Sequence, residues 1–198
     1  MTHIFTPHAF KDYRQHERVY FPEYPCGFSN LSRVLYIGCE HDNEGLEELA
    51  NKYKEVIGRD KYICNTPRCV EKRRILLRKY PNLKIMEMDA RKLSFLDEYF
   101  DGVIFKRSLS LIGGGGAKKN ERDITSALDN VHNILCGDGL VWIIYAPADI
   151  ENLTLDRMDF LLNSSSFKPV EDREDYRLYQ KVKKFHPRFG KLLKIINL

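Results

Sequence analysis

A short apolar run that stops at a glycine decides the fold of this chain: it reads RVLYIG over residues 33–38. Aliphatic and β-branched residues without polar alternation are typical of a strand buried on both faces, as in parallel sheets. Further strands are expected over residues 61–64, 83–88, 102–105 and 140–145. Helices are expected between them, over residues 44–57, 68–80, 120–135 and 155–162. Gly58 is expected to end the first of these helices.

This alternation predicts an α/β protein of three layers, a doubly wound and mostly parallel sheet with helices on both faces. The last two expected strands, residues 167–171 and 176–182, flank the polar turn DRED and predict a C-terminal antiparallel hairpin. Residues 1–30 are rich in aromatic residues, are interrupted by prolines, and are expected to form an N-terminal arm or lid. The domain is expected over residues 31–184, followed by a basic C-terminal tail over 185–198.

Length and composition exclude several classes of protein. A chain of 198 residues suits one domain, and 43% hydrophobic with 30% charged residues is a globular balance, which excludes wholesale disorder. No apolar run approaches the ~20 residues that span a bilayer, so no membrane span is expected. The N-terminus does not resemble a secretory signal. Because the five cysteines form no paired framework, we expect reduced thiols and a cytoplasmic or nuclear location.

The net charge of +4 is unevenly distributed. Residues 181–198 contain six basic and no acidic residues, a pattern that suits contact with nucleic acid or an acidic partner, or a solvated extension packed on the domain. A second basic cluster lies on the helix expected over 68–80, and we interpret it as a solvated face. It consists of Arg68, Lys72, Arg73, Arg74, Arg78 and Lys79.

Four stretches, in order along the chain, resemble landmarks of the class I S-adenosylmethionine (SAM) dependent methyltransferases. They read VLYIGC at 34–39, MDARKLSF at 88–95, YFDGVI at 99–104 and LCGDGL at 135–140. The resemblance covers about residues 33–184. It implies a seven-stranded sheet with a terminal antiparallel hairpin, SAM as cofactor, and methyl transfer to an acceptor that the sequence does not identify.

In that family the first strand runs into a glycine-rich turn, because the cofactor lies almost against the backbone there. The turn here, GCEHD at 38–42, keeps only Gly38 of the three expected glycines, with Glu40 and Asp42 at the other two positions. Tyr36 stands where the strand usually carries an acid. The resemblance places Gly38 and Glu40 at the cofactor, where carboxylates suit its ammonium group but crowd its path. The alternative is a polar helix start, with Asp42 as its N-cap.

The resemblance also places cofactor-binding residues at the ends of the second and third strands. An acid usually accepts hydrogen bonds from the ribose hydroxyls after strand two, and with that strand over 61–64 the position falls on Cys64, next to Asn65. A thiol is a poor bidentate acceptor, which argues for weakened binding. Asp89 and Ala90 match the acid and small residue after strand three, where the acid takes the adenine amino group in that family. The alternative is a solvated acid that caps the turn that follows.

Beyond the fourth strand come Lys106, Arg107 and Ser108, at positions that line the substrate side in relatives and suit an anionic substrate. Lys106 completes the candidate cofactor-binding set. No metal site is expected, because neither the cysteines nor the histidines show ligand spacing. No catalytic residue is identified, since in-line methyl transfer depends mainly on proximity and alignment.

Three functions remain open at this stage. The first is a working methyltransferase with Tyr13, Tyr20 and Phe21 of the arm closing over the site. The second is a catalytically inactive relative that no longer binds the cofactor and serves as a scaffold or interaction module, contacting a protein or nucleic acid through the arm or the tail. The third, a nucleotide-binding oxidoreductase, is disfavoured by the antiparallel hairpin and the missing third glycine.

Overall fold

The computed structural model of the chain describes residues 21, 24–25, 27–39, 42–61, 63, 65–112, 121–145 and 153–183. The expected short helix near residues 10–18, the lid candidates Tyr13 and Tyr20, and the tail from residue 184 onward lie outside these ranges. So do Glu40 and Cys64.

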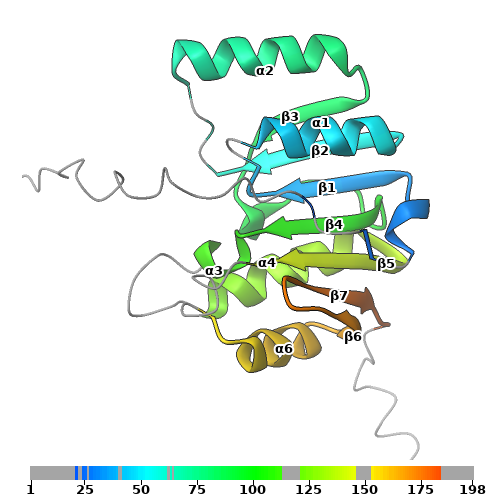
Figure 1. The fold of residues 1–198 in the computed structure, drawn as a ribbon. Helices are drawn as coiled ribbons and strands as arrows, with labels where there is room; N and C mark the ends of the chain where they lie inside the picture. Colours follow the sequence, from blue (N-terminus) through cyan, green and yellow to red (C-terminus); the bar gives the residue numbers. More distant parts are fainter. Residues whose placement is uncertain are drawn as a thin grey trace, which may run out of the picture.

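A seven-stranded sheet forms the middle layer, in the strand order β3-β2-β1-β4-β5-β7-β6 (Figure 1). Strands β1 to β5 are parallel, and β7 pairs antiparallel with both β5 and β6. Their bounds are Arg33–Ile37 (β1), Glu55–Asp60 (β2), Leu83–Glu87 (β3), Phe100–Lys106 (β4), Leu135–Ile144 (β5), Phe167–Asp172 (β6) and Tyr176–Lys181 (β7). The predicted α/β class, the mostly parallel seven-stranded sheet and the terminal hairpin are confirmed.

Helices cover both faces of the sheet, as predicted. Helices α1 (Asn43–Lys52) and α2 (Pro67–Lys79) pack on one face, in one hydrophobic cluster with alternate residues of β1, β2 and β4. Helices α4 (Glu121–Ile134) and α6 (Leu155–Ser164) pack on the other. The remaining helical turns are short: η3 (Phe28–Asn30), η4 (Ala90–Lys92) and α3 (Leu109–Ile112).

The prediction was wrong for the second strand, which the structure places six residues earlier. Helix α1 ends at Lys52, and Val56 and Ile57 lie in β2 between β1 and β3. Gly58 does not end a helix; it lies within β2, where an added Cβ would come within 2.7 Å of Leu46 Cδ2 on α1. The glycine is therefore required by the close approach of helix and strand.

A long-range contact fixes the end of α1. The side-chain amide of Asn82 donates to the carbonyls of Ala50 and Tyr53, at 2.7 and 2.8 Å, and so satisfies acceptors that a helix end leaves open.

A second difference from the prediction concerns β5. This strand begins at Leu135, which pairs with Phe100, and a register irregularity separates that pair from the pairing of Leu140 with Gly102. The expected strand began only at residue 140.

The described part of the N-terminal arm belongs to the core. Phe21, Tyr24 and Phe28 surround the fully buried Trp142 of β5, with ring centroids 5.2 to 5.5 Å from the indole. These rings cover the sheet beside α1, on the face where β4 and β5 would otherwise be bare. Within the described ranges, no helix has the length and apolar character needed to cross a membrane.

We expect Phe28→Ala to lower the free energy of unfolding by about 3–5 kcal/mol, because the ring is fully buried and its loss leaves a cavity beside Trp142. Urea denaturation followed by tryptophan fluorescence measures the change. Phe160→Ala is the control, since that ring is 55% exposed. A loss below 1 kcal/mol for Phe28→Ala would show that the arm is not part of the folding unit.

Candidate functional site

The candidate site lies at the edge of the sheet where the parallel strands end, on the left of Figure 1. Strand order reverses there between β1 and β4, and crevices at such switch points bind ligands in open α/β sheets. Gly38 ends β1 with φ +86°, and its N–H donates to the carbonyl of Arg59 at 2.8 Å. A Cβ at Gly38 would come within 2.4 Å of Ser108 Cβ, so the glycine also permits the loop after β4 to approach.

The acid at the end of the second strand is Asp60, which the sequence analysis missed. Because β2 ends at Asp60, the position expected for the ribose-binding acid falls there and not on Cys64. Asn65, the other predicted residue, is exposed and accepts a hydrogen bond from Arg73 of α2. A signal was present in the sequence. Val56 and Ile57 are adjacent β-branched residues, typical of a strand, and Asp60 follows them three residues later.

Asp60 lies close to the turn that follows β1. Burial, together with the negative charge of Asp60, raises the pKa of the Cys39 thiol to about 12. Asp60 also contributes to the raised pKa of Tyr36, where burial is the largest cause. The high pKa of Cys39 keeps this buried thiol protonated, as an inert packing residue.

Asp89 stands at the end of β3, as predicted, and its carboxylate is bound by the chain itself. It caps η4 by accepting the backbone N–H of Arg91 at 2.9 Å. The Arg91 guanidinium donates to both carboxylate oxygens, with Nε at 2.9 and 3.0 Å, and reaches Asp123 of α4 at 2.7 Å. The hydrogen bonds from Arg91 lower the pKa of Asp89 to about 2. Ala90, the predicted small residue, is buried beside it.

On the other side of Gly38, Asp42 is the centre of a second internal ion pair. Its Oδ2 accepts from Lys106 Nζ at 2.6 Å and from the Tyr36 hydroxyl at 2.5 Å, while Oδ1 accepts from the N–H of Gly45. The Lys106 side chain is only 8% exposed, and its ammonium lies 4.5 Å from the ring centroid of Phe21. Asp42 is thus both the N-cap of α1 and the partner of Lys106.

Arg59 is a buried cation that the sequence analysis also missed. It is 1% exposed, contacts Met88 Sδ, and lies over the Phe95 ring with Cζ 5.5 Å from the centroid. Its Nε and Nη2 have no hydrogen-bond partner in the described part of the chain. Burial lowers the pKa of this guanidinium to about 10.

The structure therefore gathers Gly38, Asp60, Asp89 and Ala90 at the ends of three adjacent strands, with Lys106 at the end of β4. Phe21, a predicted lid residue, packs on the sheet and reaches only the Lys106 side of this edge. The described residues contain no group of three or more histidine, cysteine, aspartate or glutamate side chains placed to hold a metal ion.

Several solved structures have this fold. A SAM dependent methyltransferase from Aquifex aeolicus aligns with 75% of this chain and 81% of its own, at 13% identity and a TM-score of 0.57. YcgJ from Bacillus subtilis aligns with 72% of this chain, at 16% identity and a TM-score of 0.55. The [4+2]-cyclase SpnF aligns with 71% of this chain, at 16% identity and a TM-score of 0.54. No protein-family profile and no curated protein matches the chain.

At these identities the likeness establishes the fold, that of the class I SAM-dependent methyltransferases, and confirms the resemblance at that level. The match spans 64% of the YcgJ chain and 52% of the SpnF chain. Because one of the matching structures is described as a cyclase, the fold alone does not define the reaction.

The Asp89–Arg91 contact implies that the free energy of unfolding depends on pH in the acid range. A carboxyl whose folded-state pKa of about 2 lies below its ordinary value stabilises the fold above about pH 4, and this contribution is lost as the pH falls towards 2. We expect the unfolding free energy of the native protein to fall by about 1–2 kcal/mol more than that of Asp89→Asn between pH 4 and 2. Denaturant titrations across this range measure it, with the exposed Asp138→Asn as control. Parallel curves for the native protein and Asp89→Asn would contradict the ion pair.

Proposed function

We propose that this protein is a SAM-dependent methyltransferase whose cofactor lies across the carboxyl ends of β1, β2 and β3. The observation that carries the proposal is the placement of Asp60, Asp89 and Gly38 at the ends of three adjacent strands, beside the switch point between β1 and β4. Two carboxylates on one side of a glycine turn suit a nucleoside, because ribose hydroxyls and an adenine amino group are hydrogen-bond donors.

The residues present fit the nucleoside part of the cofactor. Placing the acid after β2 at Asp60 removes the conflict that Cys64 posed, because a carboxylate accepts two hydrogen bonds where a thiol accepts poorly. Asp89 would receive the adenine amino group at an oxygen that Arg91 also contacts, and the small Ala90 beside it leaves room for the ring. Arg91, anchored on Asp123, would hold that carboxylate in a fixed orientation.

On the side expected for the cofactor's amino-acid part, Asp42 is the candidate partner of the ammonium group, and Lys106 already holds it. A bound cofactor would compete with the Lys106 ammonium for the same carboxylate. Lys106 released from Asp42 would be free to face an anionic acceptor. The Asp42 carboxylate stays paired throughout, because the cofactor's ammonium takes the place of the Lys106 ammonium.

When bound, SAM supplies a methyl group activated by its positive sulfonium. The work left to the chain is to hold the acceptor in line and to exclude water, which accounts for a site without an evident general base. Lys106 and Arg107 would attract an anionic acceptor to the end of β4 by charge. Phe21 supports this side of the site, since its ring packs against Tyr36 and lies beside Lys106.

The alternative is a non-catalytic relative used as a binding module, and one observation favours it. The chain's own cations, Arg91 and Lys106, already satisfy the two acids Asp89 and Asp42. In this reading the ion pairs fill the crevice and stabilise the fold, and the cofactor no longer binds.

Calorimetric titration with SAM and with its demethylated product separates the two functions. We expect micromolar binding that Asp60→Asn weakens about ten- to a hundredfold, the loss expected for charge-assisted hydrogen bonds. Asp138→Asn, an exposed acid away from this edge, is the control and should bind as the native protein does. No heat at millimolar ligand would reject the transferase in favour of the binding module.

Lys106→Met tests the competition at Asp42. Freeing this carboxylate should raise the affinity for SAM and for its demethylated product, by about tenfold for one charge-assisted contact. The affinity for 5′-methylthioadenosine, which lacks the amino-acid part, should stay unchanged. If all three ligands gain or lose affinity together, Lys106 does not act on the amino-acid part.

A further inference from the structure

Helix α2 concentrates positive charge beyond what the fold explains. Its thirteen residues include six basic side chains and one acid, Glu71, a net charge of +5. The whole chain carries +4, so all other residues together carry −1. The helix lies at one end of the molecule, outside the edge strands, as Figure 1 shows.

Three of the six basic residues have structural partners. Lys79 contacts Glu47 of α1 at 2.5 Å, Arg74 pairs with Glu71, and Arg73 donates to Asn65. These contacts tie the helix to α1 and to the segment before it, and they involve half of its basic residues.

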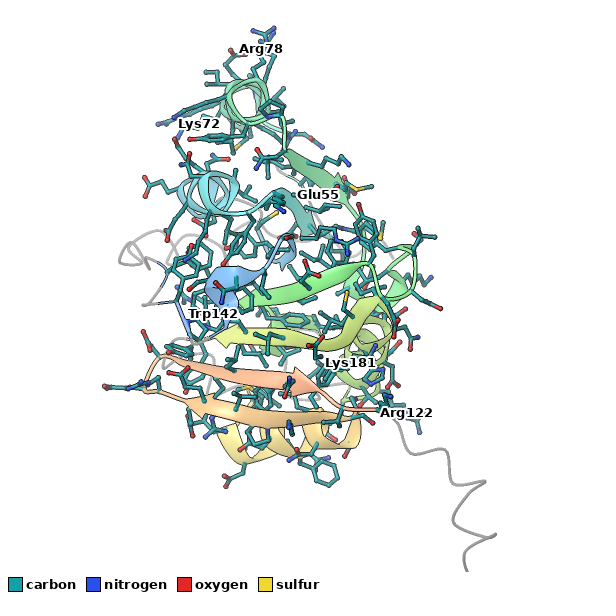
Figure 2. All side chains as sticks on the ribbon, turned by 90° about the vertical axis from the view of Figure 1, so that its right-hand side faces the viewer. Glu55, Lys72, Arg78, Arg122, Trp142 and Lys181 are labelled. Atoms are coloured by element: carbon teal, nitrogen blue, oxygen red, sulfur yellow. The ribbon has the colours of Figure 1, made fainter. Side chains whose placement is uncertain are left out.

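The other three, Arg68, Lys72 and Arg78, are exposed and form no ion pair or hydrogen bond with any described residue. Arg68 stands in the first turn, where the helix dipole disfavours a cation, and its neighbour Lys72 at i+4 adds like-charge repulsion. Arg78 repeats that spacing with Arg74. Figure 2 shows Arg78 pointing away from the body and Lys72 extending to the side of the helix, with Arg122 towards the opposite end of the sheet. Helix stability therefore does not explain Arg68 and Lys72.

We propose that α2 binds the phosphate backbone of a nucleic acid, with Arg68, Lys72 and Arg78 as its contact residues. Lys72 lies one turn, about 6 Å, from Arg68, and Arg78 lies about 15 Å from Arg68 along the helix axis. That length matches about four to five nucleotides at 3.4 Å per strand. The helix carries no aromatic side chain, so base stacking contributes little and binding should depend strongly on salt.

A nucleic acid fits this surface better than a membrane or an acidic protein does. The exposed apolar residues of α2 are Val70 and Ile75, five positions apart, which do not form the continuous apolar stripe that inserts into a bilayer. An acidic protein would need apolar or aromatic anchors at the centre of its interface, and α2 offers only these two aliphatic side chains. The inference stands on α2 alone and does not depend on the proposed transferase activity.

The test is the affinity of the full chain for a fluorescein-labelled 20-nucleotide single-stranded RNA and a 20-base-pair DNA duplex, measured by anisotropy from 50 to 200 mM salt. The triple variant Arg68→Gln, Lys72→Gln and Arg78→Gln keeps side-chain length and helix propensity. The matched control, Arg122→Gln, Lys168→Gln and Lys183→Gln, removes the same charge from exposed positions elsewhere.

We expect the α2 variant to lose at least tenfold in affinity at 50 mM salt, with a salt slope shallower by about 2 for RNA or nearly 3 for duplex DNA. The control should change by less than threefold, and the preferred probe identifies the kind of nucleic acid. Equal losses in both variants would assign binding to net charge or to the tail and overturn the proposal. The proposal would also be overturned if the native chain bound neither nucleic acid. It would be overturned as well if the native chain bound polyglutamate or phosphatidylserine vesicles as tightly as nucleic acid and the α2 variant lost that binding. Unchanged melting temperatures show that the variants are folded.

Discussion

The parallel register between β1 and β2 is the constraint on which the candidate site depends. Ile37 pairs with Arg59, and the N–H groups of Gly38 and Cys39 both donate to the Arg59 carbonyl, at 2.8 and 3.3 Å. These contacts bring the turn after β1 level with Asp60. A slip by one residue would move every side chain of β2 to the other face, so that Gly58 would no longer face α1. The close packing of α1 on β2 therefore fixes the crevice.

Charge in the crevice is arranged in a way that the glycine pattern does not reveal. The strand carries a hydroxyl at Tyr36, where the resemblance implies an acid, and the turn carries an acid at Asp42, where it implies a glycine. The structure joins these two departures, because the Tyr36 hydroxyl donates to Asp42 at 2.5 Å. Burial raises the pKa of Tyr36 well above its ordinary value, which keeps the hydroxyl protonated and able to donate. The carboxylate of this turn therefore stands at the helix cap, and Lys106 balances its charge.

The sequence predicted most of the fold, and its main error has an identifiable cause. Strand β1 and helix α2 were predicted within one residue, because an apolar run and a helical repeat with clear ends need no distant contact. The boundary between α1 and β2 was missed because Val56 and Ile57 continue the helical spacing of α1 and Gly58 looks like a helix end. What decides against a helix there is long-range: pairing with two strands and the Asn82 cap. The position of Asp60 at a strand end was missed through that one error, whereas the position of Asp89 after β3 was predicted because β3 was placed correctly.

The ion pairs of Asp89 and Asp42 were not predicted, because Lys106 was interpreted as a residue of the substrate side and no role was assigned to Arg91. Lys106 meets Asp42 from a distant strand, and Arg91 reaches Asp123 only once α4 is in place. The cations of α2 differ from those of the crevice in whether contacts within the chain account for them. Arg91 and Lys106 each face a carboxylate at 30% and 8% side-chain exposure, so packing and pairing account for them. Arg68 faces solvent in the first turn of α2, where the helix dipole disfavours a cation, and Lys72 lies one turn further along and is also exposed. The proposed phosphate partner would compensate for that placement.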